Sequence, residues 1–235
     1  MMNWNLKCGV IIIGSLLWQN YLNDEGDNLR LNWRNSHLSV EDKISVKVPI
    51  RYGRKSKSGM TMVFSNRMAK RIGFAYVVPL REKINNPNEL LCECIALSRA
   101  EGMQGNFVND WGVLAWLTNE SIIEASAKKG ITKLFNQQKI NQKINTFEYK
   151  VGRERSCVTP SLKLDINWVT PLLSSDKNTI DEFHLLLATA TKPMIKIPTY
   201  KEIAASINSD KRKYFINNVT HGIITHDDFE IAKRM

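Results

Sequence analysis

A wholly apolar segment lies near the start of the chain and ends in a turn of small residues. Val10-Ile11-Ile12-Ile13 stands between Gly9 and Gly14, and Ser15-Leu16-Leu17-Trp18 follows. A continuous β-branched run bounded by glycine is typical of a strand that is buried on both faces. A small-residue turn at its end leaves backbone N–H groups free at the rim of a sheet. We therefore expect a buried strand with a possible ligand-binding turn after it.

The composition indicates a folded chain. With 235 residues, 43% of them hydrophobic, the chain can bury a sizeable core, in one domain with an appendage or in two small domains. The first apolar run has Trp18 where a signal peptide needs small residues, and it is too short to span a membrane. We expect a cytoplasmic protein with no membrane partner. No disulfide framework is expected, and reduced thiols are predicted at Cys8, Cys92, Cys94 and Cys157.

The first hundred residues are rich in predicted strands. Residues 44–48 alternate apolar with polar side chains, as a half-exposed strand does, and residues 60–65 and 74–79 are two further strand candidates. Residues 51–59, in contrast, are predicted to form a basic loop with glycines near both ends.

A helix is predicted from Asn86-Pro87-Asn88-Glu89 onward. Asparagine caps a helix well, proline is tolerated at the first helical position, and the glutamate can reach back to the cap. The helix should end at Ala100 or Glu101, because Gly102 favours termination there. Residues 113–117 are then predicted to form another strand.

The remaining chain is predicted to be mainly helical. Residues 118–164 form a basic helical insertion or bridge, and residues 165–235 form a helical C-terminal extension. Three pairs in the extension have the spacing of a helix capping box, the last of them only weakly. These pairs are Thr179 with Glu182, Thr199 with Glu202, and Thr225 with Asp228.

Two short motifs separated by these strands and the first predicted helix suggest a family. Gly14-Ser15-Leu16 follows the first strand, and Leu97-Ser98-Arg99-Ala100-Glu101-Gly102 ends the helix. In their order and separation the chain resembles the γ-glutamylcyclotransferase-like superfamily over about residues 10–117. The resemblance implies an α+β fold, a small mixed β-sheet or barrel with flanking helices, for a core of residues 1–117.

The match is incomplete. Ile13 replaces the tyrosine usual in the first motif, and Ser98 replaces the aspartate usual in the second. Gly105-Asn106-Phe107 is a weak counterpart of the glycine-x-tyrosine that often follows the glutamate. The missing tyrosine leaves its substrate contact without a counterpart in the first motif.

The resemblance implies an intramolecular aminolysis that releases 5-oxoproline from a γ-glutamyl amine or peptide. Glu101 would be the general acid and base, with its pKa raised by partial burial. The N–H groups of Gly14, Ser15, Leu16 and Leu17 would hold substrate oxygens. The reaction needs no metal and no cofactor. The alternative for Glu101 is a solvated acid at a helix end.

Two arginines flank a glycine in the predicted basic loop. Arg51 and Arg54 could bind the α-carboxylate of a substrate through their forked guanidiniums, or a nucleotide or nucleic-acid backbone. The loop lacks the residue order of a phosphate-binding P-loop. A solvated hairpin tip is the alternative.

The net charge of +10 is concentrated in the middle of the chain, where residues 121–164 hold 9 basic and 3 acidic side chains. Five lysines there are spaced so that they could line a helix: Lys128, Lys129, Lys133, Lys139 and Lys143. A non-catalytic module that holds an anionic ligand or a nucleic acid with this stripe and the 51–59 loop is thus the alternative function. A solvated lysine-rich insert is the simpler interpretation of the stripe, because it contains one aromatic residue and no arginine.

His221 and His226 lie near two aspartates, but their spacing does not place both on one helix face, and no metal site is predicted. The six tryptophans are expected to pack in the core and at its rim.

Overall fold

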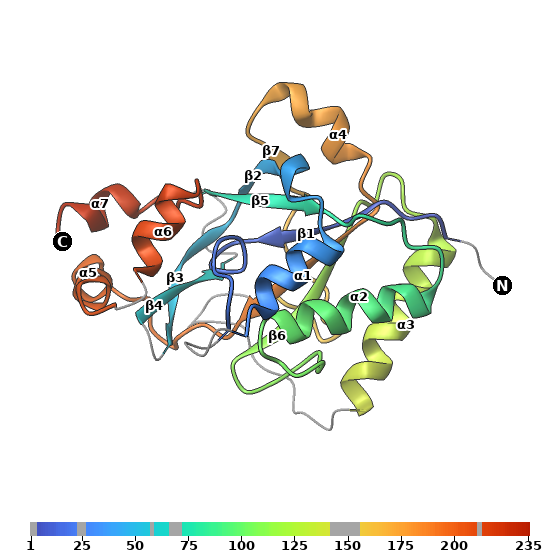
Figure 1. Ribbon diagram of the computed structural model, residues 1–235, viewed down its shortest axis with the longest axis horizontal. Helices are drawn as coiled ribbons and strands as arrows, with labels where there is room; N and C mark the ends of the chain where they lie inside the picture. Colours follow the sequence, from blue (N-terminus) through green and yellow to red (C-terminus); the bar gives the residue numbers. More distant parts are fainter. Residues whose placement is uncertain (1–3, 23–26, 57–58, 66–71, 142–155, 211–212) are drawn as a thin grey trace.

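The structure is a computed structural model that describes residues 4–22, 27–56, 59–65, 72–141, 156–210 and 213–235. Its centre is a six-stranded sheet in the order β6-β8-β1-β5-β2-β7 (Figure 1). The strands are β1 (Cys8–Ile12), β2 (Ile44–Val48), β5 (Gly73–Pro79), β6 (Gly112–Thr118), β7 (Thr170–Pro171) and β8 (Leu185–Thr191). β1 and β8 are parallel, and the other neighbouring pairs are antiparallel.

The predicted α+β class is confirmed, but the sheet is open and does not close into a barrel in the described part of the chain. One edge is β6, and the other is β7, which has two residues and pairs only with β2. So short an edge strand offers too few backbone groups to continue the hydrogen bonding around a closed ring.

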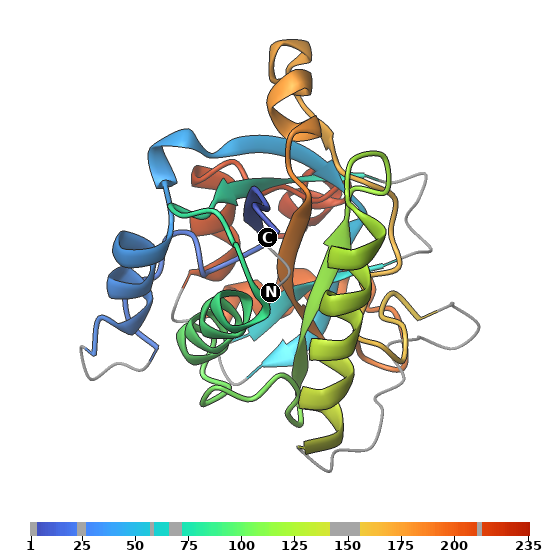
Figure 2. The ribbon, with the colours of Figure 1, turned by 90° about the vertical axis from the view of Figure 1, so that its right-hand side faces the viewer.

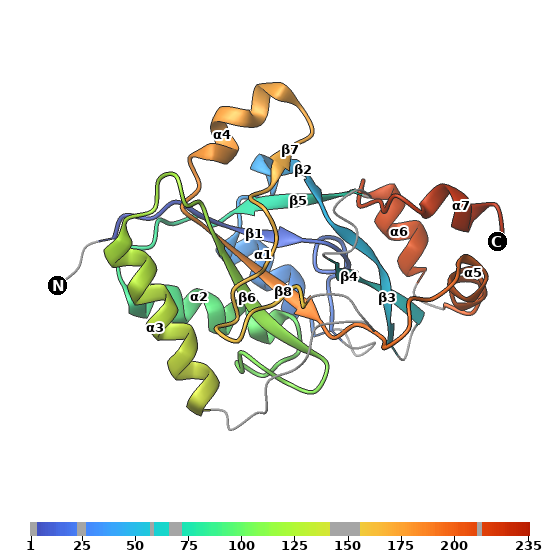
Figure 3. The same cartoon turned by 180° about the vertical axis from the view of Figure 1, so that it is seen from behind.

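Apart from α4, which lies beside β7, the helices of the described chain form two groups. In the first group α1 packs against α2, and α2 contacts α3 (Figures 1 and 2). The C-terminal helices α5, α6 and α7 gather at the other end, beside the two-stranded sheet of β3 and β4 (Figures 1 and 3). The helices are α1 (Leu29–His37), α2 (Pro87–Ala100), α3 (Ala125–Asn141), α4 (Lys177–Asp181), α5 (Tyr200–Asn208), α6 (Tyr214–Thr220) and α7 (Asp228–Ala232).

The first predicted strand is confirmed as β1. All five of its residues are buried. Ile11 lies opposite Val77 of β5 on one side and Ala188 of β8 on the other, so β1 is an inner strand. The β-branched run therefore has neighbours along both edges as well as apolar cover on both faces.

The predicted helix after residue 86 is also confirmed. The Asn86 side chain caps α2 by accepting from the backbone N–H groups of Asn88 at 3.0 Å and Glu89 at 3.1 Å. The helix ends at Ala100, and Gly102 has a φ of +80°, a left-handed conformation that glycine adopts without strain. These local signals fix where Glu101 stands.

The C-terminal region is not a purely helical extension, as the sequence had suggested. Residues 185–191 form β8, which is buried along almost its whole length and lies between β1 and β6. Its run Leu-Leu-Leu-Ala-Thr-Ala-Thr does not alternate, so its periodicity does not separate a doubly buried strand from a buried helix.

The three predicted capping pairs in this region have different outcomes. Thr199 and Glu202 form the predicted capping box at α5. Thr179, however, lies inside α4 (Lys177–Asp181) and caps nothing, because this helix ends before Glu182. Thr225 and Asp228 are joined by a side-chain hydrogen bond at the start of α7.

The predicted basic loop at residues 51–59 is wrong for most of its length. β3 (Ile50–Ser56) and β4 (Gly59–Phe64) form an antiparallel hairpin whose register shifts between Tyr52 and Arg54. The irregularity lies at Gly53, where an added Cβ would stand 2.3 Å from Nη1 of Arg51. The glycine thus makes room for an arginine side chain within the strand.

None of the four cysteines, all of which the structure describes, is joined in a disulfide; Cys92 is exposed, and Cys94 is buried. Among the described helices, none combines the length and the apolar character needed to cross a membrane.

Candidate functional site

The chain turns sharply after β1, at Gly14 to Gln19. The N–H of Leu17 donates to the Gly14 carbonyl at 3.1 Å, and the N–H of Gln19 donates to the Ser15 carbonyl at 2.8 Å. The N–H groups of Gly14, Ser15 and Leu16 have no hydrogen-bond partner within the described residues. The turn therefore presents three consecutive backbone donors, as the sequence predicted for its rim position, whereas Leu17 uses its N–H internally.

Arg34 of α1 holds the other side of this turn. Its buried guanidinium donates to the carbonyls of Leu16 at 2.8 Å and Gln19 at 2.7 Å. Burial lowers the pKa of Arg34, and the neighbouring charge of Arg30 lowers it further. The other terminal nitrogen of Arg34 donates to Asn20 Oδ1 at 2.6 Å. Because these donors bind residues of the turn and the residue after it, Arg34 supports the shape of the turn.

Arg30, one helical turn earlier, joins the two predicted motifs. Its Nη1 donates to Ser15 Oγ at 2.8 Å and to Gln19 Oε1 at 2.7 Å. Its Nη2 contacts Glu101 Oε2 at 3.1 Å, and its Nε donates to the Ala100 carbonyl. One guanidinium thus connects the turn after β1 with the end of α2.

Glu101 is the residue that follows α2, and its side chain is 16% exposed. Its Oε2 is held by Arg30, whereas its Oε1 has no hydrogen-bond partner in the described part of the chain. The sequence predicted apolar surroundings for this carboxylate. It also has a cation beside it, because Arg30 contacts one of its oxygens, and the other oxygen makes no hydrogen bond within the described residues.

The two arginines of β3 have different surroundings. Arg51 is 2% exposed, and it donates to Ser65 Oγ at 3.2 Å and to the Tyr52 carbonyl at 3.1 Å. These contacts give Arg51 a place inside the hairpin, away from solvent. It supports β3 and β4 from within.

Arg54 is half-buried, and its guanidinium lies 4.8 Å from the ring centroid of Trp111. Burial lowers the pKa of Arg54, while the charge of Glu101 acts in the opposite direction. The arginine is therefore close enough to Glu101 to sense its charge, and the structure brings this predicted residue toward the same region as the two motifs.

Tyr214 of α6 is a member of this region that the sequence did not single out. An added Cβ on Gly14 would lie 2.3 Å from the Tyr214 hydroxyl oxygen, so the phenol lies directly against the turn. Burial raises the pKa of Tyr214. No sequence signal pairs residue 14 with residue 214, because their proximity depends on how the C-terminal helices pack.

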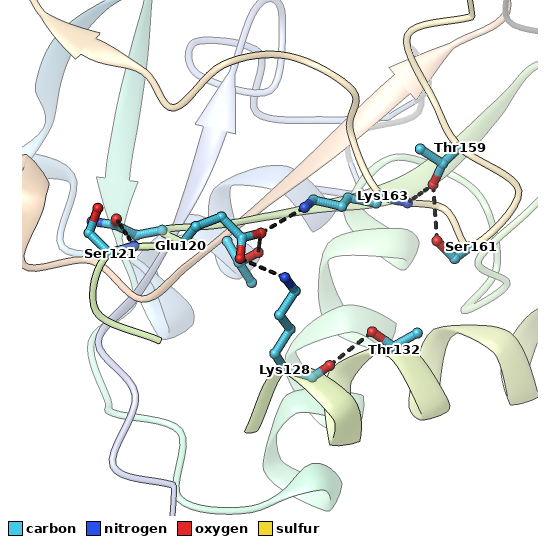
Figure 4. Close-up of polar contacts among 9 residues, drawn as sticks. Glu120, Ser121, Lys128, Thr132, Thr159, Ser161 and Lys163 are labelled. Atoms are coloured by element: carbon cyan, nitrogen blue, oxygen red, sulfur yellow. Dashed lines mark hydrogen bonds and ion pairs between the residues drawn. The ribbon is translucent and has the colours of Figure 1, made fainter. Parts of the chain in front are cut away.

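The lysine stripe is partly used within the protein. Figure 4 shows Glu120 between Lys128 and Lys163, with Nζ–Oε distances of 2.6 and 2.8 Å. Burial alone would raise the pKa of Glu120, but hydrogen bonds from Lys128, Lys163 and Thr118 outweigh it and lower the pKa to about 2. Glu120 and Lys163 line an open cleft of about 470 Å³ at the end of β6.

Of the other stripe residues, Lys139 donates to the Pro160 carbonyl at 2.7 Å, Lys129 and Lys133 are exposed, and Lys143 lies outside the described residues. The described part of α3 therefore offers two unengaged lysines, and the anion-binding alternative gains no specific support from it.

His221 makes contacts within the protein. His221 Nδ1 contacts the Asn217 carbonyl at 2.7 Å, and its ring stacks on Trp18. Among the described residues, no group of three or more His, Cys, Asp or Glu side chains could hold a metal ion.

Together, the fold and the site define an α+β protein with an open mixed sheet and a charged site at the end of an inner strand. Comparisons of the chain with models of protein families, with curated proteins and with solved structures give no match. The function is therefore inferred from the geometry of this chain.

Proposed function

We propose that this protein is a γ-glutamylcyclotransferase-like enzyme that releases 5-oxoproline from a γ-glutamyl amine or peptide. One observation carries the proposal: Arg30 contacts both Ser15, in the turn after β1, and Glu101, at the end of α2. In the described part of the chain, α1 and the strands β2, β3, β4 and β5 stand between the two motifs in the sequence. Their connection through one guanidinium supports a common site.

Glu101 is the proposed acid and base. Its Oε1, which has no described partner, takes a proton from the α-ammonium group of the substrate. The resulting amine attacks the γ-carbonyl carbon, a C–N bond forms, and the bond to the departing amine breaks. Glu101 gives this first proton to the nitrogen that departs. The attacking nitrogen then loses its second proton to the Glu101 carboxylate, which passes it to the released amine, so the products are 5-oxoproline and the amine in its protonated form. Arg30 keeps the carboxylate in position during these proton transfers.

The substrate oxygens need donors, and the site supplies two kinds. The N–H groups of Gly14, Ser15 and Leu16 are fixed by the turn and suit a carbonyl oxygen that gains negative charge during the attack. Arg54 suits the α-carboxylate, because its guanidinium has no hydrogen-bond acceptor among the described residues.

The charge balance agrees with such a substrate. Arg30 and Arg54 carry one more positive charge than Glu101 can neutralise. A γ-glutamyl compound brings an ammonium group for Glu101 and a carboxylate for Arg54. Both ends of the amino-acid moiety therefore find an opposite charge.

The test is the release of 5-oxoproline from a panel of γ-glutamyl amines and peptides, measured for the wild-type protein and for Glu101→Gln. We expect turnover by the wild type and a loss of at least about 100-fold in Glu101→Gln. Glu93→Gln is the matched control, because Glu93 lies in α2, the helix that Glu101 follows. Its Oε2 contacts His37 Nδ1 at 2.9 Å and does not contact Arg30. Undiminished turnover in Glu101→Gln would refute the assignment of the base.

A thermal-shift screen with the same compounds and with nucleotides tests the alternative function. Stabilisation by nucleotides alone would favour the anion-binding module over the enzyme.

A further inference from the structure

The phenol of Tyr214 occupies a position at the turn that only a glycine permits. The Tyr214 oxygen lies 2.3 Å from where a Cβ of residue 14 would be, which is closer than any side chain allows. Gly14 therefore gives this hydroxyl access to the backbone of the turn. The neighbouring residue, Ser15, is bound by Arg30, which also holds Glu101.

The position of the phenol is fixed by the helix that carries it. Trp18 Nε1 donates to Asn218 Oδ1 at 2.8 Å, which ties the end of the turn to α6. The ring of Trp18 meets the ring of Tyr214 edge to face, with the centroids 6.1 Å apart. The next residue of α6, Phe215, packs its ring on the ring of Tyr52 in β3, with the centroids 6.0 Å apart. Figures 1 and 3 show α6 beside β3 in both views.

The hydroxyl has a donor beside it and a proton to give. The N–H of Met62 donates to the Tyr214 oxygen over a long 3.5 Å contact. Within the described residues, no acceptor of the phenol proton is found. Burial raises the pKa of Tyr214 and outweighs the hydrogen bonds from Asn218 and Met62 that lower it, so the phenol keeps its proton at neutral pH.

We propose that Tyr214 is a catalytic residue of this site, whose hydroxyl donates a hydrogen bond to the γ-carbonyl oxygen of the substrate as negative charge develops there. This inference rests on the proposed cyclotransferase function. A fixed donor of this kind acts mainly in the transition state, since its geometry is set before the substrate binds. The C-terminal helices, which lie outside the region of family resemblance, thereby supply part of the chemistry.

The experiment compares Tyr214→Phe with the wild type in the 5-oxoproline assay. Phenylalanine keeps the ring that packs on Trp18, so the fold should persist and its melting temperature is measured alongside. We expect kcat to fall about 100-fold with KM nearly unchanged, which is the usual effect of removing one donor to a developing oxyanion. Tyr200→Phe is the matched control, because the Tyr200 hydroxyl of α5 binds Asp227 at 3.1 Å, away from the turn.

The outcomes separate the two proposals. Full activity in Tyr214→Phe, or a rise in KM at unchanged kcat, overturns the catalytic role of Tyr214 and leaves the cyclotransferase function standing. Absence of turnover in the wild type with every γ-glutamyl compound overturns the proposed function and this inference with it. An equal loss in Tyr214→Phe and Tyr200→Phe also overturns the inference, since it reveals a general effect of disturbing the C-terminal helices.

Discussion

Arg30 and Glu101 form an ion pair, 3.1 Å between Nη2 and Oε2, that fastens α1 to the end of α2. The two side chains are only 9% and 16% exposed, so water screens the pair weakly. Removing one partner of such a buried pair strongly destabilises the folded protein, because the other charge stays buried without compensation.

We predict that Arg30→Met lowers the free energy of unfolding by about 3 kcal/mol. Methionine keeps the length of the side chain but leaves Glu101 and Ser15 without their donor. The measurement is urea unfolding at neutral pH. Arg81→Met is the control, since Arg81 also contacts α1, through the Asn35 carbonyl, but is exposed. Equal unfolding midpoints for the two variants would contradict the role of Arg30.

The close approach of Tyr214 to Gly14 predicts a specific coupling between the two positions. Gly14→Ala should lower stability by about 1–3 kcal/mol, because its methyl group would overlap the phenol oxygen. Adding Tyr214→Phe removes that oxygen and leaves ring carbon Cζ, 3.2 Å from the new methyl, as the nearest neighbour. The double variant should therefore recover part of the loss, which a double-mutant cycle of unfolding free energies measures. Additive effects would show that the contact is absent in solution.

Much of the fold follows from signals that act within a few residues. Asn86 caps α2 through its neighbours Asn88 and Glu89, and Gly102 ends the same helix through its own backbone conformation. Both are visible in the sequence because partner and signal are adjacent. The position of Glu101 is therefore predictable from the sequence alone.

The parts that were not predicted depend on contacts over long distances. Residues 185–191 carry no strand periodicity, because β8 is an inner strand between β1 and β6 and its side chains are buried on both faces for almost its whole length. Gly53 suggested a loop, yet it lies in β3 because the Arg51 guanidinium fills the space of its missing side chain. Arg30 contacts Glu101, which is 71 residues away in the sequence, and Tyr214 contacts Met62, which is 152 residues away.

Arg54 is predicted to bind the substrate carboxylate. Arg54→Ala should weaken binding of 5-oxoproline, which retains that carboxylate, by about 10- to 100-fold, the usual effect of losing a hydrogen bond to a charged group. Isothermal titration calorimetry measures the change. Lys55→Ala is the matched control, because Lys55 is the exposed cation next along β3. A similar small, salt-dependent loss in both variants would argue for non-specific attraction by the hairpin instead.

Asp228 predicts a dependence of stability on pH. Burial raises its pKa to about 6 from an ordinary value of 3.8. The Thr225 hydroxyl donates to Oδ1 and opposes this rise, and Oδ2 has no hydrogen-bond partner among the described residues. Below about pH 3 the carboxyl is protonated in the folded and unfolded states alike, and it does not affect stability through ionisation. As the pH rises from about 4 to about 6, the unfolded state loses the proton first, so the folded state becomes relatively less stable.

Above about pH 7 this destabilisation is complete, at about 2–3 kcal/mol for the rise of the pKa from 3.8 to about 6. Asp228→Asn keeps the oxygen that accepts from Thr225 but carries no charge. Its stability relative to the wild type should therefore increase by about 2 kcal/mol between pH 4 and pH 7. Urea unfolding of both proteins at each pH gives this difference, and every group that titrates equally in both cancels from it. A difference that does not change with pH would mean that Asp228 ionises as readily in the folded protein as in the unfolded chain.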